Sequence, residues 1–316
     1  MSTLLLLLIL IVGGGLYGAR VWTNRLAAQA EAAIPQKGLV RAVPGGRLHY
    51  VESGPQDAPA VVLIHGLGGQ LQHFDYGVAE GLASEFRVIA VDRPGCGWSD
   101  RDGAGQAPIG EQGRMIGALL DELGVEKPTL VGHSLGGAIA LAMALDRPEK
   151  TGALALLCPL THEVAATIPV FKPLEVRSSF MRGLIGATLA APLSKRNGPA
   201  ALTAVFAPEP WPEDFPLRGG GALGLRPKAF VTASEDLAAV APAIKTQIPR
   251  YGDLKAPGGI LYGASDEILA PAVHGEPMQA HGLAYEALEG RGHMIPITRP
   301  EACVDFIRRM AGLRAA

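Results

Sequence analysis

The stretch Thr129-Leu-Val-Gly132-His-Ser134-Leu-Gly136-Gly137 decides how the rest of the sequence is interpreted. Its first residues, Thr129 to Val131, belong to a short apolar run that is typical of a buried strand. An apolar, helix-forming segment follows from Leu135 to Leu145. Gly-x-Ser-x-Gly at such a junction is typical of a nucleophile elbow, whose small residues permit a strained turn that exposes the serine hydroxyl. Ser134 is therefore the candidate nucleophile, although serine also caps helices without any chemistry.

Further apolar runs lie on both sides of this elbow, at residues 60–64, 87–91, 153–157 and 259–262, and a helical pattern covers residues 110–123. Strands that alternate with helices predict an α/β fold with a mostly parallel sheet and helices on both faces. The alternation stops after Pro159, and ten of the 25 prolines fall within residues 159–227. A structureless loop of that length is improbable, so we expect a helical cap at residues 159–257, inserted between core segments 40–158 and 258–316.

A serine nucleophile needs a histidine base. Four histidines follow Ser134, and the best placed is His293, in a loop between the strand-like residues 283–288 and a C-terminal helix that begins near Arg299. A loop after the last strand can reach the edge of the sheet where the elbow lies. His274 and His281 are interpreted as surface or loop residues.

The base in turn needs a carboxylate that leaves the carboxyl end of a strand between the nucleophile and the histidine. Asp266 meets this requirement on the turn after residues 260–262. Glu267 beside it and Glu163, which follows another strand, are the alternatives. A simple turn cap would also explain an aspartate at position 266.

The tetrahedral intermediate of acyl transfer needs N–H donors for its oxyanion. One candidate is the amide of Leu135 at the start of the helix after the elbow. The second is the amide of Leu67, in the loop His65-Gly-Leu-Gly-Gly69 that follows a buried strand. We interpret His65 as a structural hydrogen-bonding residue of this loop.

Together these segments resemble the α/β-hydrolase fold superfamily over roughly residues 40–314. The resemblance rests on the loop at residues 65–68, Asp92-Arg-Pro-Gly-Cys-Gly-Trp-Ser99, the elbow, Gly263-Ala-Ser-Asp266 and Gly292-His293. It implies a mostly parallel eight-stranded sheet, a cap over the site and no cofactor, and it makes Asp92 and Ser99 parts of a structural turn. Epoxide hydrolases and haloalkane dehalogenases of this fold carry aspartate where this chain has Ser134.

The expected function is hydrolysis of carboxylic esters by a Ser134–Asp266–His293 triad through an acyl-enzyme. Apolar residues of the cap, among them Phe171, Phe180 and Met181, favour apolar or lipid-derived esters as substrates, although packing within the cap explains them equally well. Acyl transfer and cofactor-free perhydrolysis by the same triad are the alternatives within enzymes. The alternative to an enzyme is a ligand-binding protein of this fold whose triad catalyses no reaction.

Composition limits the other function classes. The 316 residues hold 28 basic and 30 acidic side chains, a net charge of −2, which argues against nucleic acid as a partner. Three cysteines, Cys96, Cys158 and Cys303, have no metal-ligand spacing and predict neither a metal site nor a disulfide framework. We therefore expect free thiols and no bound metal.

The N-terminus predicts a membrane segment. Residues 2–19 carry no charged side chain, and Leu4 to Val12 are nine consecutive branched aliphatic residues. We expect a membrane anchor at residues 1–24, followed by a linker at residues 25–39. A cleaved signal peptide is the alternative, but no basic residue precedes the apolar run. Arg20 and Arg25 favour a cytoplasmic catalytic domain, and the opposite orientation, periplasmic or extracellular, stays open.

Overall fold

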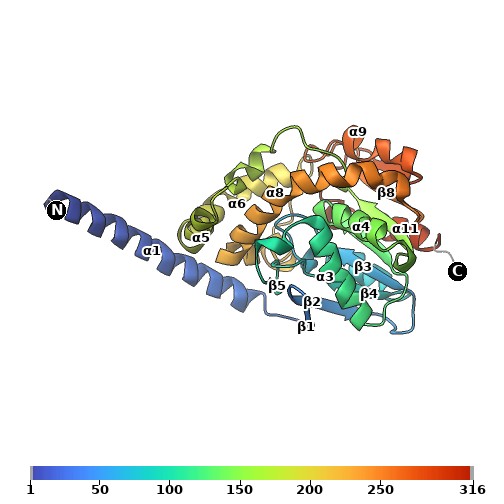
Figure 1. The fold of residues 1–316 in the computed structure, drawn as a ribbon, viewed down its shortest axis with the longest axis horizontal. Coiled ribbons are helices and arrows are strands. Elements are labelled where there is room, and N and C mark those ends of the chain that lie inside the picture. The colour runs from blue at the N-terminus through green and yellow to red at the C-terminus, as the bar shows by residue number, and fades with distance from the viewer. Residues whose placement is uncertain (1–2, 314–316) are drawn as a thin grey trace.

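The computed structural model describes residues 3–313 and contains a mixed sheet covered by helices (Figure 1). Within those residues the sheet has nine strands in the order β1-β2-β4-β3-β6-β7-β8-β9, with β5 paired to β2. The pairs β1–β2, β2–β4 and β2–β5 are antiparallel, and every pair from β4–β3 to β8–β9 is parallel. The strands are β1 (Leu39–Val43), β2 (Gly46–Ser53), β3 (Ala60–Ile64), β4 (Arg87–Val91), β5 (Asp100–Arg101), β6 (Thr129–His133), β7 (Ala153–Leu157), β8 (Gly258–Gly263) and β9 (Ala284–Leu288).

The expected α/β class and parallel sheet are confirmed, and the expected number of eight strands is wrong by one. The additional strand is β5, in which Asp100 and Arg101 pair with Arg47 and Gly46. Two residues are too few to show an alternating or continuous apolar pattern, so the sequence carries no signal for this strand.

The helices form two layers over the sheet. On one face α3 packs against α4, and on the other α2 packs against α11. Strands β3, β6, β7 and β8 are buried along their whole length because both faces are covered. The helices are α1 (Thr3–Ala33), α2 (Val78–Leu82), α3 (Ile109–Glu122), α4 (Leu135–Asp146), α5 (Ser179–Thr188), α6 (Ala190–Phe206), α7 (Phe215–Arg218), α8 (Pro227–Gln247), α9 (Pro271–His274), α10 (Ile295–Thr298) and α11 (Pro300–Ala311). Short 3-10 helices are η1 (Leu71–Phe74), η2 (Ala104–Gln106), η3 (Pro148–Lys150), η4 (Pro169–Leu174), η5 (Gly221–Leu225), η6 (Ile248–Asp253) and η7 (Glu276–His281).

The chain between β7 and β8 is helical and carries η4, α5, α6, α7, η5, α8 and η6. Helix α8 crosses the core beside α3, and α5 and α6 extend toward the N-terminal helix (Figure 1). We call this segment, residues 159–257, the cap.

Helix α1 is a single helix that projects away from the domain at its N-terminal end (Figure 1). By length and composition its residues Leu5–Ala33 could cross a membrane, a property that signal sequences share. The helix continues to Ala33, so the first nine residues of the linker expected at residues 25–39 are helical. Residues 1–2 of the expected anchor and 314–316 of the expected core lie outside the described residues.

Candidate active site

The elbow between β6 and α4 is crowded, which explains its glycines. Ser134 has φ 56° and ψ −121°, a strained conformation for a residue with a side chain. A Cβ at Gly132 would lie 2.4 Å from the carbonyl oxygen of Gly136, and one at Gly136 would lie 2.1 Å from that of Ile64. The Ser134 amide donates to the carbonyl oxygen of Leu157 over 3.0 Å, which ties the elbow to the end of β7. The strained turn is therefore held by close backbone packing on both neighbouring strands.

His293 and Asp266 meet beside this elbow. Nδ1 of His293 lies 2.7 Å from Oδ2 of Asp266, and both side chains are buried. The other oxygen of Asp266 accepts hydrogen bonds from the amides of Ile268 and Leu269 at 2.8 and 2.9 Å. A carboxylate only accepts, so Nδ1 of His293 carries the hydrogen and Nε2 keeps its lone pair. The alternative carboxylates Glu163 and Glu267 are exposed.

Ser134 is half-buried, and within residues 3–313 its hydroxyl makes no hydrogen bond. The elbow and the loop of the candidate base are in contact at the preceding residue, where the ring centroids of His133 and His293 lie 4.9 Å apart. Hydrogen bonds between a nucleophile and its base are often long before a substrate binds.

The loop after β3 passes directly over Ser134. A Cβ at Gly66 would lie 2.9 Å from Cβ of Ser134. The carbonyl oxygen of Gly66 accepts hydrogen bonds from Nη2 of Arg93 at 3.0 Å and from Nδ1 of His65 at 2.9 Å. Because a trans peptide points its C=O and N–H in opposite directions, these bonds turn the amide of Leu67 away from Arg93. In the described part of the chain, the amides of Leu67 and Leu135 donate no hydrogen bond.

His65 has the structural role expected from the sequence. Its Nε2 accepts a hydrogen bond from the amide of Arg93 at 3.0 Å, while its Nδ1 donates to Gly66. Burial, followed by the charge of Arg93, holds the pKa of His65 well below its usual value. The imidazole is therefore neutral and fixes the loop.

The comparisons with known proteins fit this arrangement. The sequence pattern of the alpha/beta hydrolase fold matches residues 59–300. The chain belongs to the alpha/beta hydrolase fold family. Among curated relatives, it is 28% identical over 273 residues to the dihydrolipoyllysine-residue acetyltransferase component of an acetoin cleaving system from Cupriavidus necator, covering 84% of this chain and 65% of that one. The corresponding component from Pseudomonas putida is 39% identical over 132 residues, covering 42% of this chain and 34% of that one.

Solved structures show the same fold. A putative lipase from Acinetobacter baumannii AYE has a TM-score of 0.69 at 20% identity, covering 92% of this chain and 96% of its own. An enol-lactonase from Burkholderia xenovorans LB400 has a TM-score of 0.70 at 22% identity, covering 87% and 100%. A membrane phospholipase A has a TM-score of 0.67 at 23% identity, covering 99% and 98%.

In this alpha/beta hydrolase the turn at residues 92–99 is structural, as the resemblance implies. The buried carboxylate of Asp92 accepts from the amides of Leu71 and Trp98 and lies 2.7 Å from Nδ1 of His49. Ser99 donates to the carbonyl oxygen of Asp92 over 2.7 Å. Neither side chain is left free for chemistry.

Two side chains that the sequence analysis did not single out hold the loop of His293. Nε2 of His133 donates to the carbonyl oxygen of His293 over 3.0 Å, and burial holds the pKa of His133 well below its usual value. From the cap, the carboxylate of Glu209 accepts from the Gly292 amide at 3.2 Å and from Arg291 at 3.1 Å. The candidate base is thus positioned by the elbow on one side and by the cap on the other. Their roles depend on contacts between distant segments, for which the sequence pattern has no signal.

A buried charged cluster joins the core to cap helix α8. Nη1 of Arg93 lies 2.8 Å from Oδ2 of Asp236, and Nη1 of Arg101 lies 2.6 Å from Oδ1 of the same carboxylate. Gln112 donates to Asp236 at 3.3 Å and accepts from Arg93 at 2.7 Å. The arginine that contacts Gly66 is therefore held by the cap.

The interpretation of His274 as a surface or loop residue is wrong. His274 ends the short helix α9 and is buried, with Nδ1 accepting from the amides of Thr161 and His162 at 3.3 and 3.2 Å. Burial lowers its pKa to about 4. It supports the chain at the start of the cap, and the charges of Asp266 and His293 also act on its pKa, so it lies near these two candidate site residues.

All three cysteines are free, as expected, and all three are buried. Sγ of Cys158 lies within 4.8 Å of ligand atoms of Asp266 and His293, a grouping that could in principle hold a metal ion. Burial, and next the charge of Asp266, raises the pKa of Cys158 well above its usual value. Nδ1 of His293 and Oδ2 of Asp266 already pair with each other, and the second oxygen of Asp266 accepts from two amides, so hydrogen bonds between protein groups account for this grouping.

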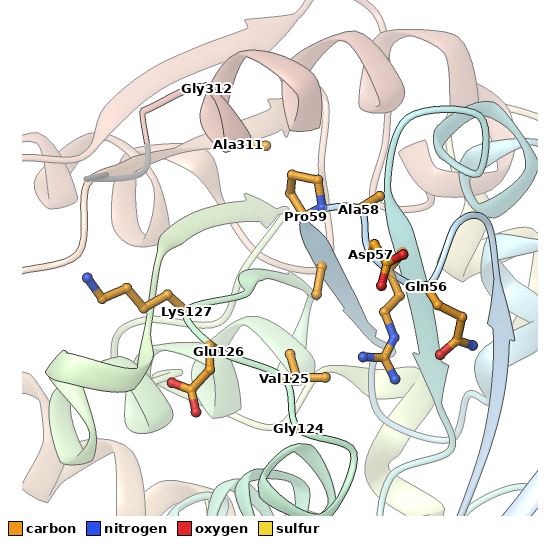
Figure 2. A pocket seen from close by; sticks show the side chains of 12 residues that line it. Gln56, Asp57, Ala58, Pro59, Gly124, Val125, Glu126, Lys127, Ala311 and Gly312 are labelled. Carbon is orange, nitrogen blue, oxygen red and sulfur yellow. The ribbon is translucent and has the colours of Figure 1, made fainter.

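A surface hollow lies far from these residues, at the amino ends of the parallel strands (Figure 2). Its lining includes Asp57 and Pro59 before β3, and Glu126 and Lys127 before β6. Ser134, Asp266 and His293 follow the carboxyl ends of strands, at the opposite edge of the sheet. The hollow therefore has no part in the candidate site.

Proposed function

We propose that the chain is a serine hydrolase that cleaves carboxylic esters, apolar or lipid-derived, through an acyl-enzyme. The observation that carries the proposal is the buried hydrogen bond between His293 and Asp266 beside the strained Ser134. A serine on an elbow and a histidine whose Nδ1 is held by a carboxylate are the components that acyl transfer requires.

In the first half of the reaction, Nε2 of His293 takes the hydroxyl proton as Oγ of Ser134 attacks the ester carbonyl carbon. Asp266 stabilises the imidazolium and keeps the ring in the required tautomer. The amides of Leu67 and Leu135 stabilise the oxyanion of the tetrahedral intermediate. When the intermediate collapses, the ester C–O bond breaks and His293 gives the proton to the leaving alcohol.

In the second half, water replaces the alcohol. His293 removes a proton from a water molecule as the water oxygen attacks the carbonyl carbon of the acyl-enzyme. The amides of Leu67 and Leu135 stabilise the second oxyanion. The acid is released and the proton returns to Ser134, which restores the free enzyme.

We also propose that α1 anchors the enzyme in a membrane, with the catalytic domain on the cytoplasmic side. The length and apolar character of α1 support anchorage, and Arg20 and Arg25 after the apolar run support the orientation. The substrate class follows the same reasoning, since a membrane-bound hydrolase meets lipid esters at high local concentration. The similarity to a membrane phospholipase A is a reason to include phospholipids among the substrates tested.

The test is a panel of p-nitrophenyl esters of graded acyl length together with phosphatidylcholine, assayed with the wild type and with Ser134→Ala. Hydrolysis that rises with acyl length and is lost in the variant supports the proposal. Wild-type activity in Ser134→Ala contradicts it.

Acyl transfer to an alcohol is the second candidate, because curated relatives are named acetyltransferases. Acyl transfer passes through the same acyl-enzyme as hydrolysis. The two reactions differ only in whether an alcohol or water attacks this intermediate. Product analysis with competing alcohols separates the two, since a transferase forms a new ester in preference to the free acid.

A further inference from the structure

The direction of α1 relative to the domain is fixed by contacts along its C-terminal half. Thr23, Leu26 and Ala30 are buried, at the three- and four-residue spacing of one helix face. Oγ1 of Thr23 donates to the carbonyl oxygen of Thr188 over 2.6 Å, and Glu31 lies 3.7 Å from Nη1 of Arg226. Helices α5 and α6 of the cap lie beside this half of α1 (Figure 1).

The N-terminal half of α1 is too short to cross a bilayer alone. Residues 5–15 are all exposed, and these 11 residues span only about 16 Å at 1.5 Å each. A hydrocarbon core of about 30 Å needs roughly 20 residues, which Thr3 to Trp22 supply. Trp22 is exposed and lies between Arg20 and Arg25, the residue types that mark the headgroup level. A spanning α1 therefore places the membrane surface near Trp22, one residue before the contact with α5.

Four exposed apolar side chains of the cap lie on these two helices or at the junction between them. Leu189 between α5 and α6 and Leu193 on α6 are each 44% exposed, and at the start of α5 Phe180 is 75% and Met181 42% exposed. We call these four residues the cap patch. Helices α5 and α6 contain the exposed cations Lys195 and Arg196 and no acidic residue, although the whole chain has a net charge of −2. Apolar side chains flanked by cations suit the boundary of an anionic bilayer.

We propose that the cap patch inserts into the membrane that α1 spans, with an anionic phospholipid bilayer as the partner. The inference rests on the proposed anchorage by α1 and extends it from the helix to the catalytic domain. Packing within the cap, one of the two explanations given above for the apolar cap residues, does not account for Phe180, since its ring faces outward and contributes little to that packing.

The test places an environment-sensitive fluorophore on single introduced cysteines of the full chain, reconstituted in vesicles of phosphatidylcholine and phosphatidylglycerol. The three native cysteines are buried and the unsubstituted chain controls for their labelling. The variants are Phe180→Cys and Leu193→Cys in the patch, Leu8→Cys in the anchor and Asp57→Cys at the opposite edge of the sheet. Lipids with a nitroxide near the top of the acyl chain quench a label that inserts about 5–10 Å.

We expect quenching at positions 180 and 193 at least about twofold stronger than at position 57, and weaker without phosphatidylglycerol. Labels at 180 and 193 that are quenched no more than at 57, while the label at 8 is quenched, overturn the proposal. A label at 180 shielded by a second copy of the chain, without quenching by lipid, also overturns it. An unquenched label at position 8 contradicts the anchorage itself, and ester hydrolysis is measured separately, so the failures are distinguishable.

Discussion

The guanidinium of Arg93 donates to the carbonyl oxygen of Gly66 over 3.0 Å while it pairs with Asp236 of the cap at 2.8 Å. One buried side chain thus connects cap helix α8 with the loop that carries the Leu67 amide. Because the Gly66–Leu67 peptide is rigid, the direction of its N–H depends on what holds its carbonyl.

Arg93→Lys tests this connection. Lysine keeps the charge opposite Asp236 but lacks the planar fork that reaches Gly66 at the same time. We expect kcat on a soluble ester to fall about 10- to 100-fold with little change in KM, because an oxyanion donor acts in the transition state. Arg101→Lys is the matched control, since Arg101 also pairs with Asp236 and does not contact the loop. Equal losses of kcat in the two variants would contradict the assignment.

Asp266→Asn tests the role of the carboxylate. An amide at this position can donate toward Nδ1 of His293 and favours the wrong tautomer, so we expect kcat to fall about 10³- to 10⁴-fold with the fold intact. The measurement is kcat by ester hydrolysis together with Tm. Glu267→Gln, at the exposed neighbouring acid, is expected to retain full activity. A comparable loss of kcat in this variant would indicate that Glu267, and not Asp266, is the carboxylate that supports His293.

His133 is predicted to position the base through the backbone. His133→Phe removes the hydrogen bond to the carbonyl oxygen of His293. A bond of about 1 kcal/mol predicts a fall in kcat of roughly fivefold to tenfold. His133→Gln restores a donor and should recover most of the activity. Failure of glutamine to perform better than phenylalanine would mean that ring packing, and not the hydrogen bond, is what matters.

Stability should fall in mild acid. Burial is the first cause that lowers the pKa of His65, His73, His133 and His274, to about 4 for His73 and His274. Below the unfolded value of about 6.5, the unfolded chain binds protons that the folded chain excludes, so the free energy of unfolding is greatest above pH 7. It decreases from about pH 6.5 toward pH 4, by up to about 1.4 kcal/mol per pH unit for each histidine. Thermal unfolding at pH 7.5 and pH 5.0 checks this, and an equal or higher Tm at pH 5.0 would contradict it.

The sequence was sufficient for features that depend on local chain order. The elbow combines an apolar strand, small residues and a helix within a few positions, and Asp266 and His293 each follow a strand, so both could be placed at one sheet edge. Contacts between distant segments could not be predicted. Arg93 and Asp236 are 143 residues apart, and their pairing depends on how α8 crosses the core. His274 was misplaced because its burial comes from the chain that folds over it.

The first part of the segment expected as a linker, residues 25–39, is helical as far as Ala33. The alanine-rich residues 27–33 favour helix, and packing of Leu26 and Ala30 against the domain stabilises it. This packing involves distant segments, so the sequence pattern alone does not indicate it.

The central claim, that Ser134 is a nucleophile activated by His293, is tested most directly by intact-protein mass spectrometry after treatment with a fluorophosphonate. The account predicts that the wild type gains one phosphonyl group, mapped to Ser134 by peptide analysis, and that Ser134→Ala gains none. It also predicts that His293→Ala reacts far more slowly. A wild type that stays unmodified under conditions that label a control serine esterase, or a Ser134→Ala variant labelled as fully as the wild type, would contradict it.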